Sequence, residues 1–158
     1  MRGLGGRDPS IRGESRDAKV EQMDIWIKKK RSWVMSRILG KNTQPEIKVR
    51  QLLHAMGYRF RIHKKGLPGK PDIVLKKHKA IIFVHGCFWH LHGKCRDGRI
   101  PKTNVTFWSK KLLANKKRDK LNTKKLQKEG WKILRLFECE IEKKREDTIR
   151  KIAAFLNT

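Results

Sequence analysis

One stretch of the chain begins as a buried strand and ends as a cluster of side chains that can bind metal. Residues 80–84 are apolar throughout, which predicts a central strand with both faces covered. Residues 85–95, which follow at once, hold three of the six histidines and two of the three cysteines. Upstream, residues 72–75 form another apolar segment that starts with a carboxylate, Asp72. The sequence therefore predicts a carboxylate and histidines on neighbouring strands, beside a group of thiols.

The spacing of apolar residues elsewhere predicts the remaining elements. The expected helices cover residues 32–39, 43–56, 105–128 and 145–156, and the expected strands cover residues 58–62, 72–75, 80–84 and 131–137. Thr43 is expected to cap the second helix, with Glu46 three residues on as a capping box requires. This order predicts an α/β fold in which a mixed sheet is flanked by helices. We expect a single domain over residues 31–158, preceded by a basic, flexible arm over residues 1–30.

The high positive charge of the chain indicates which class of partner it binds. The chain carries 41 Lys and Arg against 15 Asp and Glu, and its net charge of +26 is spread along the whole sequence. Such a surface binds a polyanion by releasing condensed counterions, which indicates nucleic acid. A solvated basic protein kept apart from nucleic acid is one alternative. A ribosome-type structural protein is another, and it would explain the charge but not the cysteines and histidines.

No apolar run approaches the length that spans a bilayer, and no signal-peptide segment follows the start of the sequence. We therefore expect an intracellular, reducing compartment, in which cysteines stay free to bind metal.

The cysteines and one histidine have the spacing of a zinc site. Cys87, His92 and Cys95 follow the pattern C-x4-H-x2-C, and Cys139 follows the last predicted strand. Thiolate and imidazole ligands without an open position are typical of structural zinc. The alternative is that Cys87 and Cys139 are small buried residues and that His92 only packs.

A second group can carry out chemistry on a phosphodiester. Asp72 offers the oxygen ligands that Mg²⁺ prefers. His85 and His90 can transfer protons near neutral pH. The alternative is that Asp72 caps a turn and that His85 is a core histidine with its hydrogen bonds satisfied. Phe88 and Trp89 lie in the same loop, either as rings that wedge into DNA or as an apolar plug over the zinc ligands.

Together these residues resemble the very short patch repair (Vsr) family of DNA mismatch endonucleases. The resemblance covers roughly residues 31–139. It is carried by Lys41-Asn42-Thr43, Pro45-Glu46, Gly57-Tyr58-Arg59-Phe60-Arg61, Leu67-Pro68-Gly69-Lys70-Pro71-Asp72, Phe83-Val84-His85-Gly86-Cys87-Phe88-Trp89-His90, Pro101-Lys102-Thr103-Asn104, Phe107-Trp108, Asn115, Arg118-Asp119, Gly130-Trp131 and Glu138-Cys139.

The resemblance implies a restriction-endonuclease-like core in which Phe83 and His85 replace the usual second acid and lysine. It further implies catalytic roles for five side chains. Asp72 and the main-chain carbonyl of Val84 would bind Mg²⁺. His90 would activate water, with Asp119 orienting it. His85 would lie at the scissile phosphate, and Glu46 near the water on the metal.

The resemblance also implies residues that touch DNA or hold the loop. Phe88, Trp89 and Trp108 would enter the duplex beside the mismatch, and Lys70 and Asn115 are expected to contact DNA. Cys87, His92, Cys95 and Cys139 would bind structural zinc. The interval between His92 and Cys95 is one residue longer than the family pattern, and Val84 stands where threonine is common.

The resemblance thus implies a strand-specific, Mg²⁺-dependent nicking endonuclease. Its expected substrate is a T:G mismatch left by deamination of 5-methylcytosine, cut on the 5′ side of the mismatched T. The alternatives are a related nickase without mismatch specificity and a zinc-stabilised DNA-binding module that does not cut. Double-stranded DNA is the expected partner, with mismatch-repair proteins as further candidates. We expect a cytoplasmic, nucleoid-associated monomer.

Overall fold

The computed structural model describes Trp33 and residues 40–157. The predicted arm over residues 1–30 lies outside the described residues, as does the predicted helix over residues 32–39 apart from Trp33. Residues Lys41–Thr158 form a compact unit that holds all the elements discussed below.

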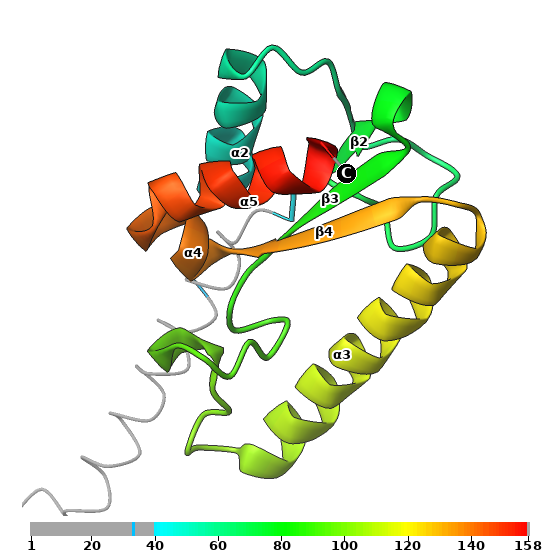
Figure 1. The fold of residues 1–158 in the computed structure, drawn as a ribbon. Helices are drawn as coiled ribbons and strands as arrows, with labels where there is room; N and C mark the ends of the chain where they lie inside the picture. The colour runs from blue at the N-terminus through cyan, green and yellow to red at the C-terminus, as the bar shows by residue number, and fades with distance from the viewer. Residues whose placement is uncertain (1–32, 34–39, 158) are drawn as a thin grey trace, which may run out of the picture. The chain divides into compact units, whose positions relative to one another are not determined.

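A four-stranded mixed sheet runs through the middle of this unit (Figure 1). Its strands, in spatial order, are β1 (Arg61–Ile62), β2 (Ile73–Leu75), β3 (Ala80–His85) and β4 (Lys132–Phe137). β2 pairs antiparallel with β1 and with β3, whereas β3 and β4 are parallel. β3 is therefore an inner strand, and five of its six residues are buried, as its apolar sequence predicts.

Helices cover both faces of this sheet. They are α2 (Gln44–Ala55), α3 (Val105–Lys128), α4 (Glu138–Lys143) and α5 (Arg145–Asn157), and two short 3-10 helices span Lys76–His78 and Arg96–Gly98. α2, α4 and α5 lie on one face, and α3 crosses the other (Figure 1). The predicted fold class, a mixed sheet flanked by helices, is confirmed.

Two sequence predictions about local structure need correction. The strand expected over residues 58–62 is only two residues long, because only Arg61 and Ile62 pair with β2. α4 was not predicted, and it begins where the Glu140 carboxylate accepts the Phe137 N–H at 3.1 Å. A six-residue helix is too short to show helical periodicity in a sequence.

The start of α2 also differs in detail from the capping box. Thr43 has the extended backbone of an N-cap, but Glu46 accepts hydrogen bonds from the Thr43 hydroxyl at 2.9 Å and from the Asn42 N–H at 3.0 Å. The Glu46 carboxylate thus ties together the residues ahead of the helix.

The pleat of the sheet divides the buried residues into two clusters, since successive side chains point to opposite faces. The larger cluster joins the strands to α2, α4 and α5, and the smaller one joins them to α3 through Leu126. Among the described residues, no helix is both long enough and apolar enough to span a membrane.

Candidate active site and thiolate cluster

The carboxylate of Asp72 lies against a main-chain N–H near the end of β3. Asp72 immediately precedes β2, and its Oδ2 accepts the Val84 N–H at 2.8 Å. Burial raises the pKa of Asp72 to about 6; the Val84 hydrogen bond opposes this shift, and the charge of Glu46 adds to it. The site therefore holds a partly desolvated carboxylate with a second acid close enough to repel it. That is an environment in which a divalent cation would be stabilised.

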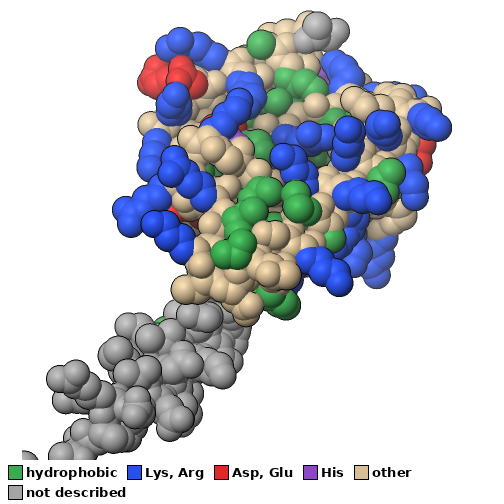
Figure 2. Space-filling model, turned by 90° about the horizontal axis from the view of Figure 1, so that it is seen from below, with side chains coloured by type: hydrophobic (Ala, Val, Ile, Leu, Met, Phe, Trp, Pro, Cys, Tyr) green, Lys and Arg blue, Asp and Glu red, His purple; other side chains and the backbone are tan. Residues whose placement is uncertain are grey.

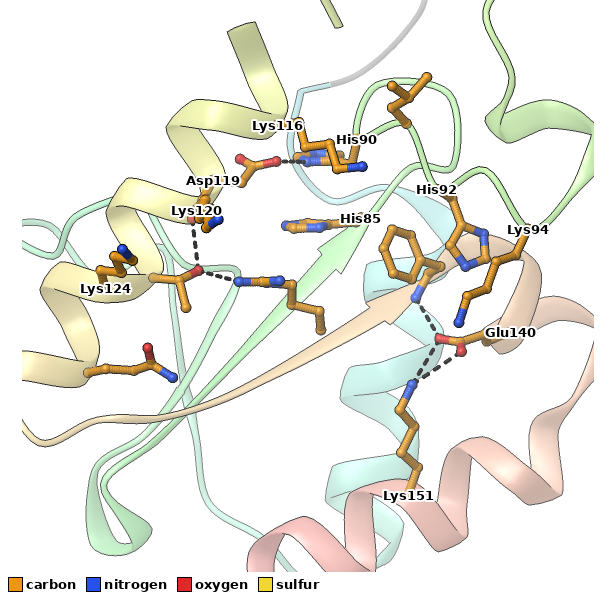
Figure 3. A pocket seen from close by; sticks show the side chains of 15 residues that line it. His85, His90, His92, Lys94, Lys116, Asp119, Lys120, Lys124, Glu140 and Lys151 are labelled. Atoms are coloured by element: carbon orange, nitrogen blue, oxygen red, sulfur yellow. Dashed lines mark hydrogen bonds and ion pairs between the residues drawn. The ribbon is translucent and has the colours of Figure 1, made fainter. Parts of the chain in front are cut away.

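His85, the last residue of β3, and His90, in the loop that follows, form a stacked pair. Their ring centroids are 3.7 Å apart and the ring planes differ by 5°. His90 Nδ1 lies 2.6 Å from Oδ2 of Asp119, which comes from α3 (Figure 3). Burial lowers the pKa of His85, and the neighbouring charge of His90 lowers it further. The pair thus combines a neutral, buried imidazole with one that a carboxylate orients.

Ionisation of Asp119 fits this role. Burial by itself would raise the pKa of Asp119, but the hydrogen bond to His90 and the positive charges nearby lower it overall. The ligand atoms of His85, His90 and Asp119 all lie within 4.8 Å of one another. The structure therefore brings these three predicted residues together, at the strand whose amide binds Asp72.

Glu46 is buried in a network that sequence reasoning did not anticipate. Besides its bonds to Thr43 and Asn42, its Oε2 accepts from Arg50 Nη2 at 2.9 Å. Arg50 also donates to Asn42 Oδ1 at 2.8 Å. Both oxygens of Glu46 are thus engaged within the start of α2, while its charge still acts on Asp72. The i,i+4 spacing of Glu46 and Arg50 was the available sequence signal.

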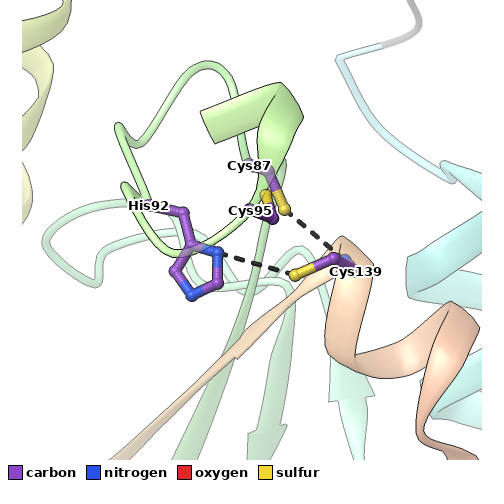
Figure 4. Close-up of side chains that lie close together, drawn as sticks. All are labelled: Cys87, His92, Cys95 and Cys139. Atoms are coloured by element: carbon purple, nitrogen blue, oxygen red, sulfur yellow. Dashed lines mark hydrogen bonds between the residues drawn. The ribbon is translucent and has the colours of Figure 1, made fainter. Parts of the chain in front are cut away.

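The thiolate cluster consists of Cys87, His92, Cys95 and Cys139, whose side chains converge on one point (Figure 4). Their ligand atoms lie within 4.8 Å of one another, and the three cysteines are free thiols. A tetrahedral zinc site with Zn–S bonds of about 2.3 Å needs its sulfurs roughly 3.8 Å apart. Burial raises the pKa of the Cys87 thiol, so a cation would be needed to hold its thiolate form at neutral pH. The donor set and its spacing fit zinc.

Two glycines allow the loop that carries these ligands to fold tightly. Gly93, between His92 and Cys95, has φ +74°, a conformation that other residues rarely adopt. At Gly98, a Cβ atom would lie 2.9 Å from the Gly93 nitrogen and from the His92 Cβ. The longer interval between His92 and Cys95 therefore does not keep the ligands apart.

Aromatic rings gather beside the histidines. Phe88, Trp89 and Trp108 contact one another edge to face, with centroid distances between 5.1 and 6.2 Å. Phe107 joins them and is 52% exposed. Figure 2 shows hydrophobic side chains gathered on one surface, with Lys and Arg around them. Phe88, Trp89 and Trp108 are half-buried, so Phe107 is the ring of this group that is most available to a partner.

The other two predicted DNA-contacting residues are placed differently. Asn115 on α3 donates from Nδ2 to the Trp89 carbonyl at 3.3 Å, so it braces the ring-bearing loop from within. Lys70 is exposed in the turn before Asp72, with a positive φ of 50°.

A cavity of about 630 Å³ opens next to the histidine pair (Figure 3). His85, His90 and His92 line it on one side and α3 on the other. Arg135 of β4 also lines it and was not predicted as a site residue, because a cation in an alternating strand looks like an ordinary solvent-facing position.

Known proteins resemble this chain over most of its described length. The family model for the DNA mismatch endonuclease Vsr matches residues 23–96. The type II nicking enzyme V.XorIIP of Xanthomonas oryzae pv. oryzae is 48% identical over 112 residues, covering 71% of this chain and 82% of that protein. The DNA mismatch endonuclease Vsr of Escherichia coli is 37% identical over 118 residues, covering 75% of each. Among solved structures, the catalytic domain of homing endonuclease I-Bth0305I is 21% identical, covers 72% of this chain and 94% of that one, and has a TM-score of 0.49.

Proposed function

Because this chain belongs to the Vsr family of DNA mismatch endonucleases and is therefore a DNA endonuclease, we propose that it nicks one strand of duplex DNA at a T:G mismatch. The mismatch would arise by deamination of 5-methylcytosine. Cleavage would hydrolyse the phosphodiester 5′ to the mismatched T and leave a 5′-phosphate. The observation that carries this proposal is the arrangement of His90, which Asp119 orients and His85 stacks upon, at the strand that binds Asp72.

The hard cation of this reaction would be magnesium, held by Asp72 and the carbonyl of Val84. Within a strand, the N–H and C=O of one residue point to the same neighbouring strand, so the Val84 carbonyl faces the side that its amide does. Glu46 adds a second negative charge, which raises the pKa of Asp72. When bound, magnesium would polarise the phosphate and neutralise charge that develops on its oxygens.

The imidazole of His90 would carry out the proton transfer. With Nδ1 of His90 donating to the Asp119 carboxylate, Nε2 is left with a lone pair that can take a proton from water. The stacked His85 limits the positions that the His90 ring can adopt. His85 itself would lie against the scissile phosphate.

The thiolate cluster would hold zinc in a structural role. Cys87, His92 and Cys95 come from the loop after β3, and Cys139 comes from α4 after β4. Zinc there would join the ends of the two parallel strands and fix the segment that carries His90. The His92 ring stacks on Phe137 at 3.9 Å, and Phe137 in turn contacts the His85 ring at 5.7 Å.

DNA would contact the aromatic rings and the basic surface together. Phe88, Trp89 and Trp108 would enter the duplex beside the mismatch, with Lys70 contacting its backbone and Asn115 supporting the rings. We place the protein in the cytoplasm on nucleoid DNA, acting as a monomer, with mismatch-repair proteins as candidate partners.

A strand-specific nicking assay tests the proposal. A T:G duplex, its matched counterpart and duplexes with other mismatches are each labelled on both strands and incubated with magnesium or with EDTA. We expect a nick in the T strand of the T:G duplex only, and only with magnesium. Equal cleavage of the matched duplex would replace mismatch repair with a nickase that lacks mismatch specificity. Binding without any cleavage would indicate the non-cutting module.

A further inference from the structure

The cavity beside the histidine pair is strongly basic. It is lined by six Lys or Arg side chains, namely Lys94, Lys116, Lys120, Lys124, Arg135 and Lys151. Its two acids are already engaged: Asp119 binds His90, and Glu140 binds Lys151 at 3.1 Å. Most of the positive charge in this cavity is therefore available to a ligand.

Three of these lysines form a row on α3. Lys116, Lys120 and Lys124 recur at i, i+4 and i+8, on neighbouring turns about 6 Å apart along the axis (Figure 3). Like charges at this spacing repel one another and destabilise a helix. Among residues 40–157, none of the three has a carboxylate within ion-pair distance. An anion in the cavity would relieve the repulsion.

Arg135, an exposed residue of β4, lines the cavity and is held by a hydrogen bond to α3. Its Cα pairs in register with Phe83 of β3, two pairs before the pair that contains His85. Its Nη2 donates to the buried Thr123 hydroxyl at 2.7 Å, and that hydroxyl donates to the Asp119 carbonyl at 2.8 Å. The same turn of α3 therefore positions both the carboxylate that holds His90 and the guanidinium. A guanidinium held through one nitrogen keeps its other donors for the oxygens of an anion such as a phosphate.

We infer that Arg135, pinned by Thr123 and flanked by the lysine row on α3, forms a subsite for a DNA phosphate next to the scissile one on the nicked strand. The inference rests on the proposed function, since the histidine pair would mark the scissile phosphate. Arg135 lies on β4, and Asp72 directly precedes β2, so the two residues belong to strands on opposite sides of β3. The ligand of the subsite is a phosphodiester, which matches the cations and not the apolar rings nearby.

The test measures the energetic coupling between Arg135 and individual DNA phosphates. Affinity is measured without magnesium, and with zinc retained in the protein, for T:G duplexes in which one phosphate, at each position flanking the expected nick, is replaced by a neutral methylphosphonate. For the wild type, one or two flanking positions should weaken binding roughly tenfold, as expected for loss of a charge-assisted hydrogen bond. For Arg135→Gln, neutralising that same phosphate should cost nothing further. Lys128→Gln, which removes an exposed cation of α3 outside the cavity, should retain the full loss.

Two further variants separate the subsite from general charge. Thr123→Val should lose part of the Arg135 coupling without any change in net charge, and Thr123→Ser should restore it. Arg135→Gln should also reduce the slope of log affinity against log salt by about 0.9 in magnitude, the value for one phosphate contact. Thermal melts of each variant verify folding, and Arg135→Lys provides a second measurement if the glutamine variant does not fold.

The inference is overturned if no flanking phosphate couples to Arg135, or if Lys128 couples to the same one. A rise in melting temperature in inorganic phosphate, lost in Arg135→Gln but without coupling to any DNA phosphate, would assign the cavity to free phosphate instead. Because binding is measured without magnesium, the outcome does not depend on cleavage. A wild type that binds but does not nick would refute the proposed function alone.

Discussion

The two faces of the sheet differ in what they bury. The face covered by α2, α4 and α5 packs eleven buried apolar residues into one cluster. The α3 face packs only four, and beyond them it exposes His85, Arg135 and Asp119 to a cavity. One face therefore supplies most of the hydrophobic stabilisation, and the other gives up packing so that polar groups can face a ligand. Stability and chemistry are separated by the alternation of side chains along the strands.

This separation allows the site to contain groups that would be unstable without the rest of the fold. Burial raises the pKa of Asp72 and lowers that of His85, and both shifts show that the charged forms lack solvation. Strained or desolvated groups persist only when the surrounding structure holds them in place. Here the larger cluster does so from the other side of the same strands.

The largest effect should come from Asp72→Asn. The amide keeps an oxygen for the Val84 N–H but loses the negative charge that would bind magnesium. We expect nicking to fall at least about a thousandfold with DNA binding largely intact, measured by single-turnover cleavage and by affinity in EDTA. Cleavage retained in magnesium would remove Asp72 from the active site.

The same substitution should stabilise the metal-free protein. A carboxyl whose folded pKa is raised to about 6 binds its proton more tightly in the folded state. The wild type therefore loses stability as pH rises from about 4 to about 6, and Asn removes that loss. Above pH 6 the variant should be more stable by on the order of 2 kcal/mol in EDTA, as measured by denaturant unfolding. A less stable variant would contradict the desolvation of Asp72.

Cys139→Ser probes the link between the two strand ends. Loss of this thiol should lower zinc content and thermal stability together, by roughly 10 °C, because a structural metal contributes folding free energy directly. Metal analysis and thermal melts provide the two measurements. An equally stable variant without zinc, or a wild type purified without zinc, would show that the cluster has no structural metal.

Ile152→Ala tests the other face of the sheet. Ile152 on α5 is fully buried in the larger cluster, away from the histidines. Removing its side chain should cost about 2–5 kcal/mol of unfolding free energy. The rate of nicking per folded molecule should remain that of the wild type at temperatures well below the melt. A comparable loss of rate would mean that the two faces are coupled.

Asp119→Asn should affect the rate more than the binding. The amide carries no negative charge. The His90 ring therefore loses the carboxylate that orients it, and its protonated form loses the stabilisation that this carboxylate gives. We expect the cleavage rate to fall about 10- to 100-fold with little change in KM. A change confined to KM would instead place Asp119 in DNA binding.

The sequence predicted the long or strongly patterned elements well. The boundaries of α3 and the inner position of β3 follow from periodicity and from an unbroken apolar run. The short helix α4 was missed because one turn and a half shows no period. The four thiolate-cluster residues could be grouped by ligand chemistry alone, since three of them lie in one loop.

The rest depends on contacts between distant parts of the chain. His90 and Asp119 are 29 positions apart, and only the resemblance to a family suggested their pairing. Arg135 and Thr123 gave no sequence signal, because an arginine in a strand and a threonine in a helix are both ordinary. The network of Arg50 around Glu46 depends on the left-handed backbone of Asn42 and His63, which the sequence did not reveal.

The smallest effect should come from Asn115→Ala. Asn115 donates to the Trp89 carbonyl at 3.3 Å, a partly buried contact that supports the ring-bearing loop without touching the histidines. Losing it should reduce affinity for the T:G duplex by a few-fold, about 1 kcal/mol, and leave the single-turnover rate unchanged. Tryptophan fluorescence on DNA binding provides a direct readout of the rings. A loss of affinity as large as that of Trp89→Ala would mean that Asn115 contacts DNA itself, and the α3 face would then bind the duplex over a wider surface than the rings and the cavity.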